Sequence, residues 1–453
     1  MQLQERIDAS RMSPYQWLIV GLCIVLNALD GFDVLAMAFT ANSVTREFGL
    51  SGGELGILLS AGLVGMAAGS LGLAPFADVI GRRPMVLISV GLATAGMLLA
   101  ALSHSAVELG IWRVVTGLGI GGILACTNVI ASEYSSKRWR GLAISIYTAG
   151  YGIGATLGGA AAVSLQASFG WRSVFLFGGI CTAATLLLLA ALLPESVDFL
   201  ASRRPRNVVD RLNKIARRIG QPALTELPAV AAIAKTGKKN KLSELFTAGN
   251  RRSTLLVWLA FFATMFGFYF VNSWTPRLLV TAGMTESQGV TGGLMLTLGG
   301  TFGSLLYGVL TIRWNSRKVM IAFAVLSAAT MVMFISTAGI LALAFAAGGV
   351  VGMLINGCIA GMYTIAPALY GASVRSTGVG WAIGIGRVGA IVAPLITGAL
   401  LDAHWTASML YMGVGVVVLV AGAAVAAMRP SIAQASSGAA AAEAAEEKLT
   451  TAV

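Results

Sequence analysis

Two acidic residues, Asp30 and Asp33, lie three positions apart within the apolar stretch from Trp17 to Phe39. Residues three apart share one face of a helix, so both carboxylates point the same way. A carboxylate at the centre of a bilayer costs at least about 2.5 kcal/mol, and such residues usually mark an ion or substrate path. Because two close carboxylates in a low dielectric do not both ionise easily, the pair predicts proton binding and release. A purely structural polar contact between helices is the alternative.

Two arginines, Arg113 and Arg387, also fall inside apolar stretches. At about 1.5 Å per residue, Asp30 and Arg113 lie at roughly the same depth in a core of about 30 Å, and Arg387 lies close to the midplane. A guanidinium can hold a carboxylate through two parallel hydrogen bonds, so either arginine could bind an anionic substrate. Pairing with the aspartates is the alternative for both. Arg113, Gly117 and Gly121 share one helical face, which we expect to line a cavity.

The chain around these residues has the composition of a polytopic membrane protein. Of its 453 residues, 57% are hydrophobic and 11% are charged, whereas soluble proteins carry about 25% charged residues. We predict twelve spans, each long enough to cross a bilayer. They lie at about 17–39, 53–76, 85–102, 107–131, 141–164, 171–193, 253–275, 287–312, 319–337, 339–365, 377–400 and 407–428.

The basic residues gather on one side of the predicted spans. Of the 31 Lys and Arg residues, 26 fall on the side that carries both termini, 3 on the opposite side and 2 inside spans. This is the positive-inside distribution, so we predict that both termini are cytoplasmic. It also accounts for the net charge of +12 without a nucleic-acid partner. The four cysteines all fall in apolar spans, and their spacing predicts neither disulfides nor a metal site.

The chain contains an internal repeat at an offset of 235 residues. For example, Arg82-Arg83-Pro84-Met85 corresponds to Arg317-Lys318-Val319-Met320. We therefore predict an all-α membrane protein of two six-helix repeats, with the substrate site near the midplane at their interface. The predicted parts are an N-terminal bundle (1–194), a basic cytoplasmic linker (195–250), a C-terminal bundle (251–428) and a cytoplasmic low-complexity tail (429–453).

Four motifs resemble segments of known transporters. Asp78-Val79-Ile80-Gly81-Arg82-Arg83 resembles the loop between helices 2 and 3 of the major facilitator superfamily, although Val79 replaces an arginine of the family's pattern. Asp30-Gly31-Phe32-Asp33, together with Pro194-Glu195-Ser196 and Gly384-Ile385-Gly386-Arg387-Val388-Gly389, resembles the aromatic acid:proton symporters. The resemblance implies the major facilitator fold and import of benzoates, hydroxybenzoates and related products of aromatic hydrocarbon catabolism with protons. It also implies that the helix-1 aspartates and the helix-4 arginine Arg113 are functional.

The remaining candidate residues form two groups. An aromatic anion needs polar and aromatic contacts, and the predicted substrate-binding residues besides the two arginines are Asn128, Asn272, Asn356, Tyr147, Tyr151, Phe266, Tyr269, Tyr363 and Trp381. Charged cytoplasmic residues could hold the two halves together when that side is closed. The predicted members of this conformational latch are Asp78, Gly81, Arg82, Arg83, Glu133, Arg138 and Arg140. For the arginines, setting the membrane topology is the alternative.

Together with what the resemblance implies, these features predict a proton-coupled symporter that imports small aromatic carboxylates across a bacterial inner membrane. We expect the proton gradient to be the energy source, without a cofactor, and we expect a monomer whose partners are substrate, protons and lipid. No nucleotide-binding loop, catalytic triad or metal cluster is readable, so we expect no enzymatic activity. The alternatives are a symporter for another organic anion, an efflux antiporter for drugs or metabolites and, as a different class, a non-transporting membrane receptor.

Overall fold

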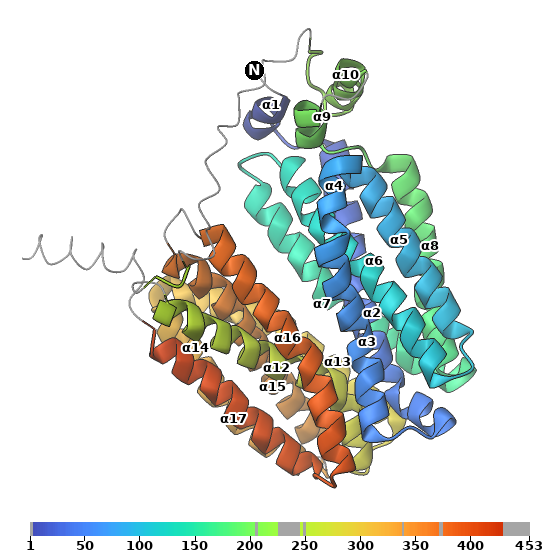
Figure 1. Cartoon of the computed structure of the whole chain (residues 1–453), viewed down its shortest axis with the longest axis vertical. Coiled ribbons are helices and arrows are strands. Elements are labelled where there is room, and N and C mark those ends of the chain that lie inside the picture. Colours follow the sequence, from blue (N-terminus) through green and yellow to red (C-terminus); the bar gives the residue numbers. More distant parts are fainter. Residues whose placement is uncertain are drawn as a thin grey trace, which may run out of the picture. The chain divides into compact units, whose positions relative to one another are not determined.

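The computed structural model describes residues 3–203, 207–224, 245–247, 251–337, 339–370 and 375–428, and the regular structure in these residues is helical (Figure 1). The helices of the first half are α1 (Leu3–Ala9), α2 (Pro14–Phe48), α3 (Gly52–Gly72), α4 (Ala74–Ile80), α5 (Arg82–Ala101), α6 (Ala106–Glu133), α7 (Arg140–Phe169), α8 (Arg172–Leu192), α9 (Val197–Arg203) and α10 (Val208–Arg218). Those of the second half are α12 (Arg251–Thr281), α13 (Glu286–Arg313), α14 (Ser316–Phe334), the short 3₁₀ helix η1 (Ile335–Thr337), α15 (Leu341–Leu369), α16 (Arg375–Asp402) and α17 (Ala407–Ala426).

The long helices coincide with the predicted spans. Twelve of the described helices have 19 residues or more, and each predicted span overlaps one of them. Among the described residues, eleven helices are long and apolar enough to cross a membrane. The exception is the 30-residue α7, whose many Gly, Ser and Thr residues lower its mean hydropathy. The predicted all-α membrane fold is confirmed.

Local sequence signals set the ends of these helices, as α2 illustrates. The hydroxyl of Ser13 accepts a hydrogen bond from the backbone N–H of Gln16, and the Gln16 side chain accepts one from the N–H of Ser13. Pro14, which has no N–H to satisfy, occupies the first helical position. At the other end, Gly49 adopts a left-handed φ of 63° that terminates the helix.

The chain forms two compact units. The first comprises residues 1–234, 272–297 and 394–404, and the second comprises residues 235–271, 298–393 and 405–453. The first unit therefore contains the first-half bundle together with the C-terminal part of α12, the start of α13 and the end of α16.

Part of the predicted linker is folded onto the first bundle. α9 and α10 lie with α1 at one end of the first-half helices (Figure 1). α10 buries Val208, Leu212 and Ile215 in the same core as Leu3 and Ile7, while its basic residues are exposed. Helical spacing of apolar residues explains this two-sided arrangement. The rest of the linker, at 204–206, 225–244 and 248–250, and the low-complexity tail at 429–453 lie outside the described residues.

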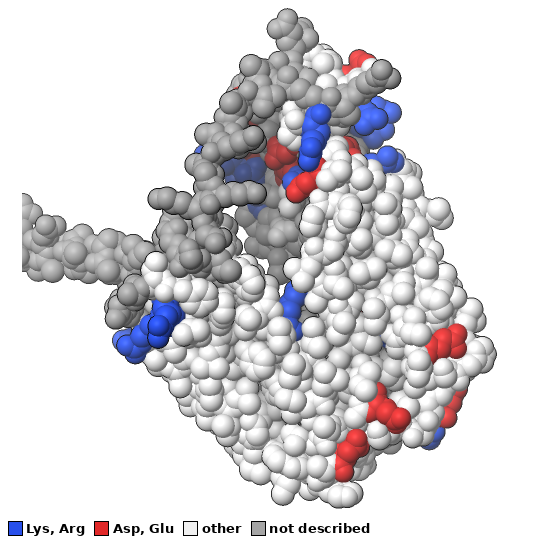
Figure 2. Space-filling model, in the orientation of Figure 1, with Lys and Arg blue, Asp and Glu red and all other residues white. Residues whose placement is uncertain are grey.

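Most charged side chains on the visible face lie near the ends of the long helices. On the face shown in Figure 2, blue and red atoms gather around the position of α9 and α10, and red atoms lie near the opposite helix ends. The surface between is white except for one small blue group near the middle and another at the left edge. Because hydrocarbon solvates charged groups poorly, this distribution fits helices that span a membrane.

Candidate functional site

The centre of the first bundle contains a buried ion pair between Asp33 of α2 and Arg113 of α6. The two side chains are 4% and 3% exposed, and one terminal nitrogen of Arg113 contacts a carboxylate oxygen of Asp33. The other terminal nitrogen donates a hydrogen bond to the backbone carbonyl of Asp33 at 3.0 Å. Removing one partner of such a pair costs about 3–5 kcal/mol, because the remaining charge stays in a low dielectric. The pair therefore joins α2 and α6, and the depth of Arg113 was predicted to match that of Asp30, three residues before Asp33 on α2.

Two further residues of the first bundle hold the Arg113 side chain. Its guanidinium carbon lies 5.7 Å from the ring centroid of Phe175 in α8, which is a cation–π contact. It also faces Gly62 of α3, where an added Cβ would lie 3.1 Å from a terminal guanidinium nitrogen. Neither Phe175 nor Gly62 was predicted, because nothing in the sequence indicates which residues of α3 and α8 face Arg113.

A small cavity lies beside the ion pair. It is lined by Asp30, Asp33, Thr116 and Thr182, together with apolar residues of α2, α5 and α6, and its volume is about 10 Å³. This is space for about one water molecule and far too little for an aromatic ring. Asp30, like Asp33, is buried. The two aspartates therefore share a cavity that can hold one water molecule, and a carboxylate there can bind a proton. An aromatic substrate does not fit in it.

A polar network connects α2 to α6 and α7 next to this cavity. The side-chain amide of Asn27 donates to the backbone carbonyl of Tyr147 at 2.7 Å, and the hydroxyls of Tyr147 and Thr127 are 2.9 Å apart. Tyr147 also lies near enough to Asp30 for an electrostatic interaction. Tyr147 was predicted to bind substrate, but here its ring is buried and its hydroxyl bonds within the first bundle.

The glycines of α6 have a different role from the predicted one. An added Cβ at Gly117 would lie 2.0 Å from the carbonyl oxygen of Gly62, and one at Gly121 would lie 2.2 Å from that of Met66. These glycines therefore let α3 and α6 pack backbone against backbone. The prediction that they line a cavity is wrong, because a neighbouring helix occupies the space.

In the second unit, aromatic side chains of α12, α15 and α16 lie side by side. Trp381 of α16 stacks on Trp258 of α12 with ring centroids 6.0 Å apart, and Tyr363 of α15 lies edge-on to Phe261 of α12 at 5.7 Å. Trp381 and Tyr363 are both exposed, at 47% and 46%. Arg387 of α16 is half-buried and near enough to Tyr363 for an electrostatic interaction. Within the described part of the chain, no acidic side chain forms a salt bridge with Arg387.

The other predicted substrate-binding residues are spread over both units. Asn128 is exposed on α6, and Phe266 stacks on Phe262 within α12 at 6.2 Å. The side-chain amide of Asn356 donates to the carbonyl of Gly352, one turn earlier in α15, at 3.0 Å. The remaining three are buried or half-buried on α7 and α12: Tyr151, Tyr269 and Asn272.

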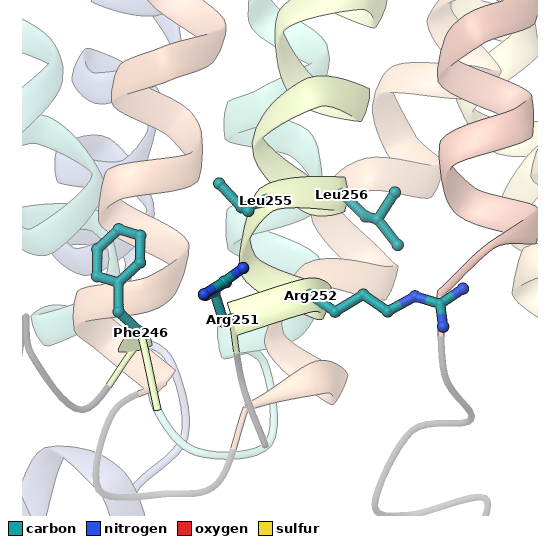
Figure 3. Close-up of a pocket in the computed structure, with 5 residues that line it drawn as sticks. All are labelled: Phe246, Arg251, Arg252, Leu255 and Leu256. Atoms are coloured by element: carbon teal, nitrogen blue, oxygen red, sulfur yellow. The ribbon is translucent and has the colours of Figure 1, made fainter. Parts of the chain in front are cut away.

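A larger hollow lies at the start of α12 in the second unit. It measures about 640 Å³ and is lined by Phe246, Arg251, Arg252, Leu255 and Leu256. Figure 3 shows Arg251 and Leu255 on the side of α12 that faces Phe246, whereas Arg252 and Leu256 point to the other side. The two guanidinium groups do not converge on one point, so these residues do not form a carboxylate clamp. None of them was predicted as a site residue.

A second charged cluster lies at the Asp78–Arg83 motif of the first half, which the sequence predicts to be cytoplasmic. Arg82 of α5 forms an ion pair with Glu133 at the end of α6, and its guanidinium donates to the hydroxyl of Ser196 at 2.9 Å. The Ser196 hydroxyl in turn donates to Glu133 at 2.7 Å. All three residues belong to the first unit, so Arg82 and Glu133 bind within one half of the chain. A latch between the two halves stays a prediction.

Glu195 is a member of this cluster that was not predicted as a site residue. One of its carboxylate oxygens accepts hydrogen bonds from the backbone N–H groups of Arg82, Arg83 and Ser196 at 2.9, 3.0 and 2.9 Å. α5 begins at Arg82, so the carboxylate lies at the positive end of the helix dipole. Tyr134 donates its hydroxyl to the Glu195 carbonyl at 2.7 Å, and burial raises the pKa of Tyr134 well above its usual range, which keeps this donor protonated. In the sequence, the Pro194-Glu195-Ser196 motif was the signal that could have identified Glu195 as a site residue.

The other predicted latch residues lie outside the Arg82 cluster. Arg140 forms an ion pair with Asp8, and the guanidinium of Arg138 lies 5.6 Å from the ring centroid of Trp139. The side chain of Asp78 is exposed. The structure therefore brings together Arg82 and Glu133 of the predicted set, with the backbone of Arg83 nearby.

Position 81, directly before α5, requires glycine because of its backbone conformation and the nearby Glu195 carboxylate. Its φ of 107° is one that L-residues rarely adopt, and an added Cβ would lie 2.4 Å from a carboxylate oxygen of Glu195. We expect Gly81→Ala to lower the free energy of unfolding by about 1–3 kcal/mol, measured as a lower midpoint of thermal unfolding in detergent. Gly91→Ala, in open space within α5, is the matched control and should not lower the midpoint. An equal drop in both variants would contradict this role of Gly81.

Comparison with known proteins places the chain among membrane transporters. A family model described as Major Facilitator Superfamily matches residues 20–306 and 293–452. The chain is 33% identical over 405 residues to a gallate transporter of Pseudomonas putida, with 89% of each chain covered. It is 32% identical over 414 residues to the 4-hydroxybenzoate transporter PcaK of Pseudomonas aeruginosa, covering 89% of this chain and 90% of the relative.

A solved structure shares the fold. The xylose transporter XylE from E. coli, in a partially occluded inward open conformation, matches with a TM-score of 0.71 at 16% identity, covering 93% of this chain and 99% of the other. Both the fold and the relatives are those of multi-pass membrane transporters, so the protein is a transporter and not an enzyme. The predicted family is confirmed, and the chain belongs to the major facilitator superfamily.

Proposed function

We propose that the protein is a proton-coupled symporter that imports small aromatic carboxylates, of the benzoate and hydroxybenzoate kind, across the bacterial inner membrane. The observation that carries the proposal is the buried pair of Asp33 and Arg113 beside a cavity that Asp30 shares. Ionisable groups are costly at this depth in a membrane, and a proton carrier needs them there. The substrate class rests on the similarity to transporters named for gallate and 4-hydroxybenzoate.

The two intramembrane arginines have different partners, which supports different roles. Arg113 is bound to Asp33 beside a cavity with space for about one water molecule. Arg387 is half-buried close to Tyr363, and no described acidic residue pairs with it. We therefore assign the proton to the Asp30, Asp33 and Arg113 group and the substrate carboxylate to Arg387, with Trp381 and Tyr363 as contacts for the ring.

Charge balance gives a reason for coupling between proton and anion. The membrane interior carries two aspartates and two arginines, Asp30, Asp33, Arg113 and Arg387, whose charges cancel when all four are ionised. Protonation of one aspartate leaves one excess positive charge, and a substrate monoanion restores neutrality. Moving an uncompensated charge through hydrocarbon is costly, so the empty and the fully loaded states are the ones that reorient. One proton per monocarboxylate follows.

Uptake of labelled 4-hydroxybenzoate into proteoliposomes tests this proposal. With the outside more acidic by one pH unit and the membrane potential clamped at zero, we expect accumulation to approach about tenfold, because one pH unit corresponds to about 1.4 kcal/mol. Reversing the gradient should drive release of preloaded substrate. Uptake indifferent to the gradient would contradict proton coupling. Accumulation against a reversed gradient would instead identify an antiporter.

A further inference from the structure

Asp402 belongs to the second half of the chain and contacts the first half. The contact lies at the end of the long helices where α3 begins. Asp402 belongs to the first compact unit, which includes residues 394–404. It is the last residue of α16, and its two carboxylate oxygens accept hydrogen bonds from the backbone N–H groups of Gly52 at 2.6 Å and Gly53 at 2.7 Å. Gly52 and Gly53 are the first two residues of α3. The carboxylate thus caps a helix of the other half.

Asp402 supplies the acceptors for two of the four N–H groups at the start of α3. The N–H of Ser51 donates to the Glu54 side chain at 2.8 Å, and the N–H of Glu54 donates to the Ser51 hydroxyl at 3.2 Å. A helix start leaves four such N–H groups without intrahelical partners, and Asp402 accepts from the remaining two. Charge-assisted hydrogen bonds at the positive end of a helix dipole are roughly twice as strong as neutral ones. Asp402 therefore completes the cap of α3.

The same two helix ends touch through their backbones. An added Cβ at Gly52 would lie 2.6 Å from the carbonyl oxygen of Gly398 in α16, and one at Gly398 would lie 2.2 Å from that of Gly52. One turn further along α3, a Cβ at Gly56 would lie 2.5 Å from the carbonyl oxygen of Pro394. Only glycine permits this approach, and it brings the Asp402 carboxylate within reach of the α3 N–H groups.

A second contact between the halves lies on α2 and α13. Glu286, the first residue of α13, forms an ion pair with Arg46 at 2.9 Å and accepts a hydrogen bond from the Ser43 hydroxyl at 3.0 Å. The Arg46 side chain is 75% exposed, and ion pairs of this kind contribute about 0–1 kcal/mol. Asp402 makes the stronger contact, because its backbone donors are fixed in place and cannot rotate away.

We propose that Asp402, supported by Glu286, is an outer clasp that holds the outer end of the transport path shut, and that breaking its hydrogen bonds to α3 opens the path to the outside. The proposal rests on the proposed function in two respects, namely that the two halves of the chain part on one side at a time and that the start of α3 faces the outside. Contacts that join the halves at one end must then break in every cycle. The clasp sets how often the outer side opens.

Leu294→Cys provides a reporter on α13, the helix that begins with Glu286. Leu294 is half-buried on α13, and its Cδ1 lies 3.1 Å from where a Cβ at Gly159 of α7 would be, so it lies between the two halves. The full-length protein in right-side-out vesicles is treated with a membrane-impermeant maleimide, with and without Asp402→Ala. We expect Asp402→Ala to speed labelling of the reporter at least about tenfold, because the closed outer side loses both hydrogen bonds. Asp402→Asn, which keeps one acceptor oxygen and loses the charge, should give an intermediate rate.

The controls separate opening from misfolding. Glu108→Gln changes a half-exposed acidic residue in the first turn of α6 on the same side and should label at the parent rate. Gly398→Ala keeps the carboxylate but forces the helix ends apart, so it should also speed labelling even if Asp402→Ala folds poorly. Parent-rate labelling in both variants would overturn the clasp. Because labelling needs neither substrate nor a pH gradient, its outcome is independent of the uptake test of the proposed function.

Discussion

Asp33→Asn should abolish accumulation of substrate driven by a pH gradient while exchange of substrate across the membrane partly survives. The amide can still accept a hydrogen bond from Arg113, but it cannot take up and release a proton. At an imposed gradient of one pH unit, we expect the accumulation ratio to fall from about tenfold to about one. Proteoliposome uptake measures accumulation, and counterflow of labelled against unlabelled substrate measures exchange.

Asp33→Asn also leaves Arg113 as a buried charge without its counter-ion, so folding must be controlled. Breaking a buried pair by removing one partner costs about 3–5 kcal/mol. The double variant Asp33→Asn/Arg113→Gln removes both charges and should recover stability, measured by thermal unfolding in detergent, without recovering accumulation. Asp210→Asn, an exposed residue of α10, is the matched control and should accumulate like the wild type. Wild-type accumulation by folded Asp33→Asn protein would remove Asp33 from the coupling mechanism.

The helices of this protein could be predicted because their signals are local. Long apolar stretches, the Ser13 and Gln16 capping box and the left-handed Gly49 all act within a few residues of one another. The depth of Asp30 and Arg113 also follows from position along a helix alone. For this reason the twelve spans match the long helices.

The contacts that hold the site together depend on which helix faces which, and the sequence does not contain that information locally. Glu195 caps α5 from 113 positions away, and Asp402 caps α3 from 350 positions away. In isolation each is an ordinary acidic residue near a helix end. The glycines of α6 were misinterpreted for the same reason, since a small residue can line a cavity or admit a neighbouring helix.

Arg387→Lys should weaken substrate binding while leaving proton coupling intact. A guanidinium can hold a carboxylate through two parallel hydrogen bonds, whereas an ammonium acts as a point charge. Losing one charge-assisted hydrogen bond corresponds to about 1.4 kcal/mol or more, so we expect KM for 4-hydroxybenzoate to rise at least about tenfold. The accumulation ratio at saturating substrate should stay near the wild-type value, because the Asp30, Asp33 and Arg113 group is untouched.

Comparing Arg387→Lys with Arg113→Lys decides which arginine binds the substrate carboxylate. Arg113→Lys disturbs the ion pair with Asp33 and should lower accumulation more than it raises KM, the reverse of Arg387→Lys. Arg375→Lys makes the same chemical change at the exposed first residue of α16 and should alter neither quantity. If Arg387→Lys left KM unchanged while Arg113→Lys raised it, the substrate carboxylate would belong to Arg113. The proton site and the anion site would then be one site in the first bundle, and the cavity beside Asp33 would have to widen to admit the ring.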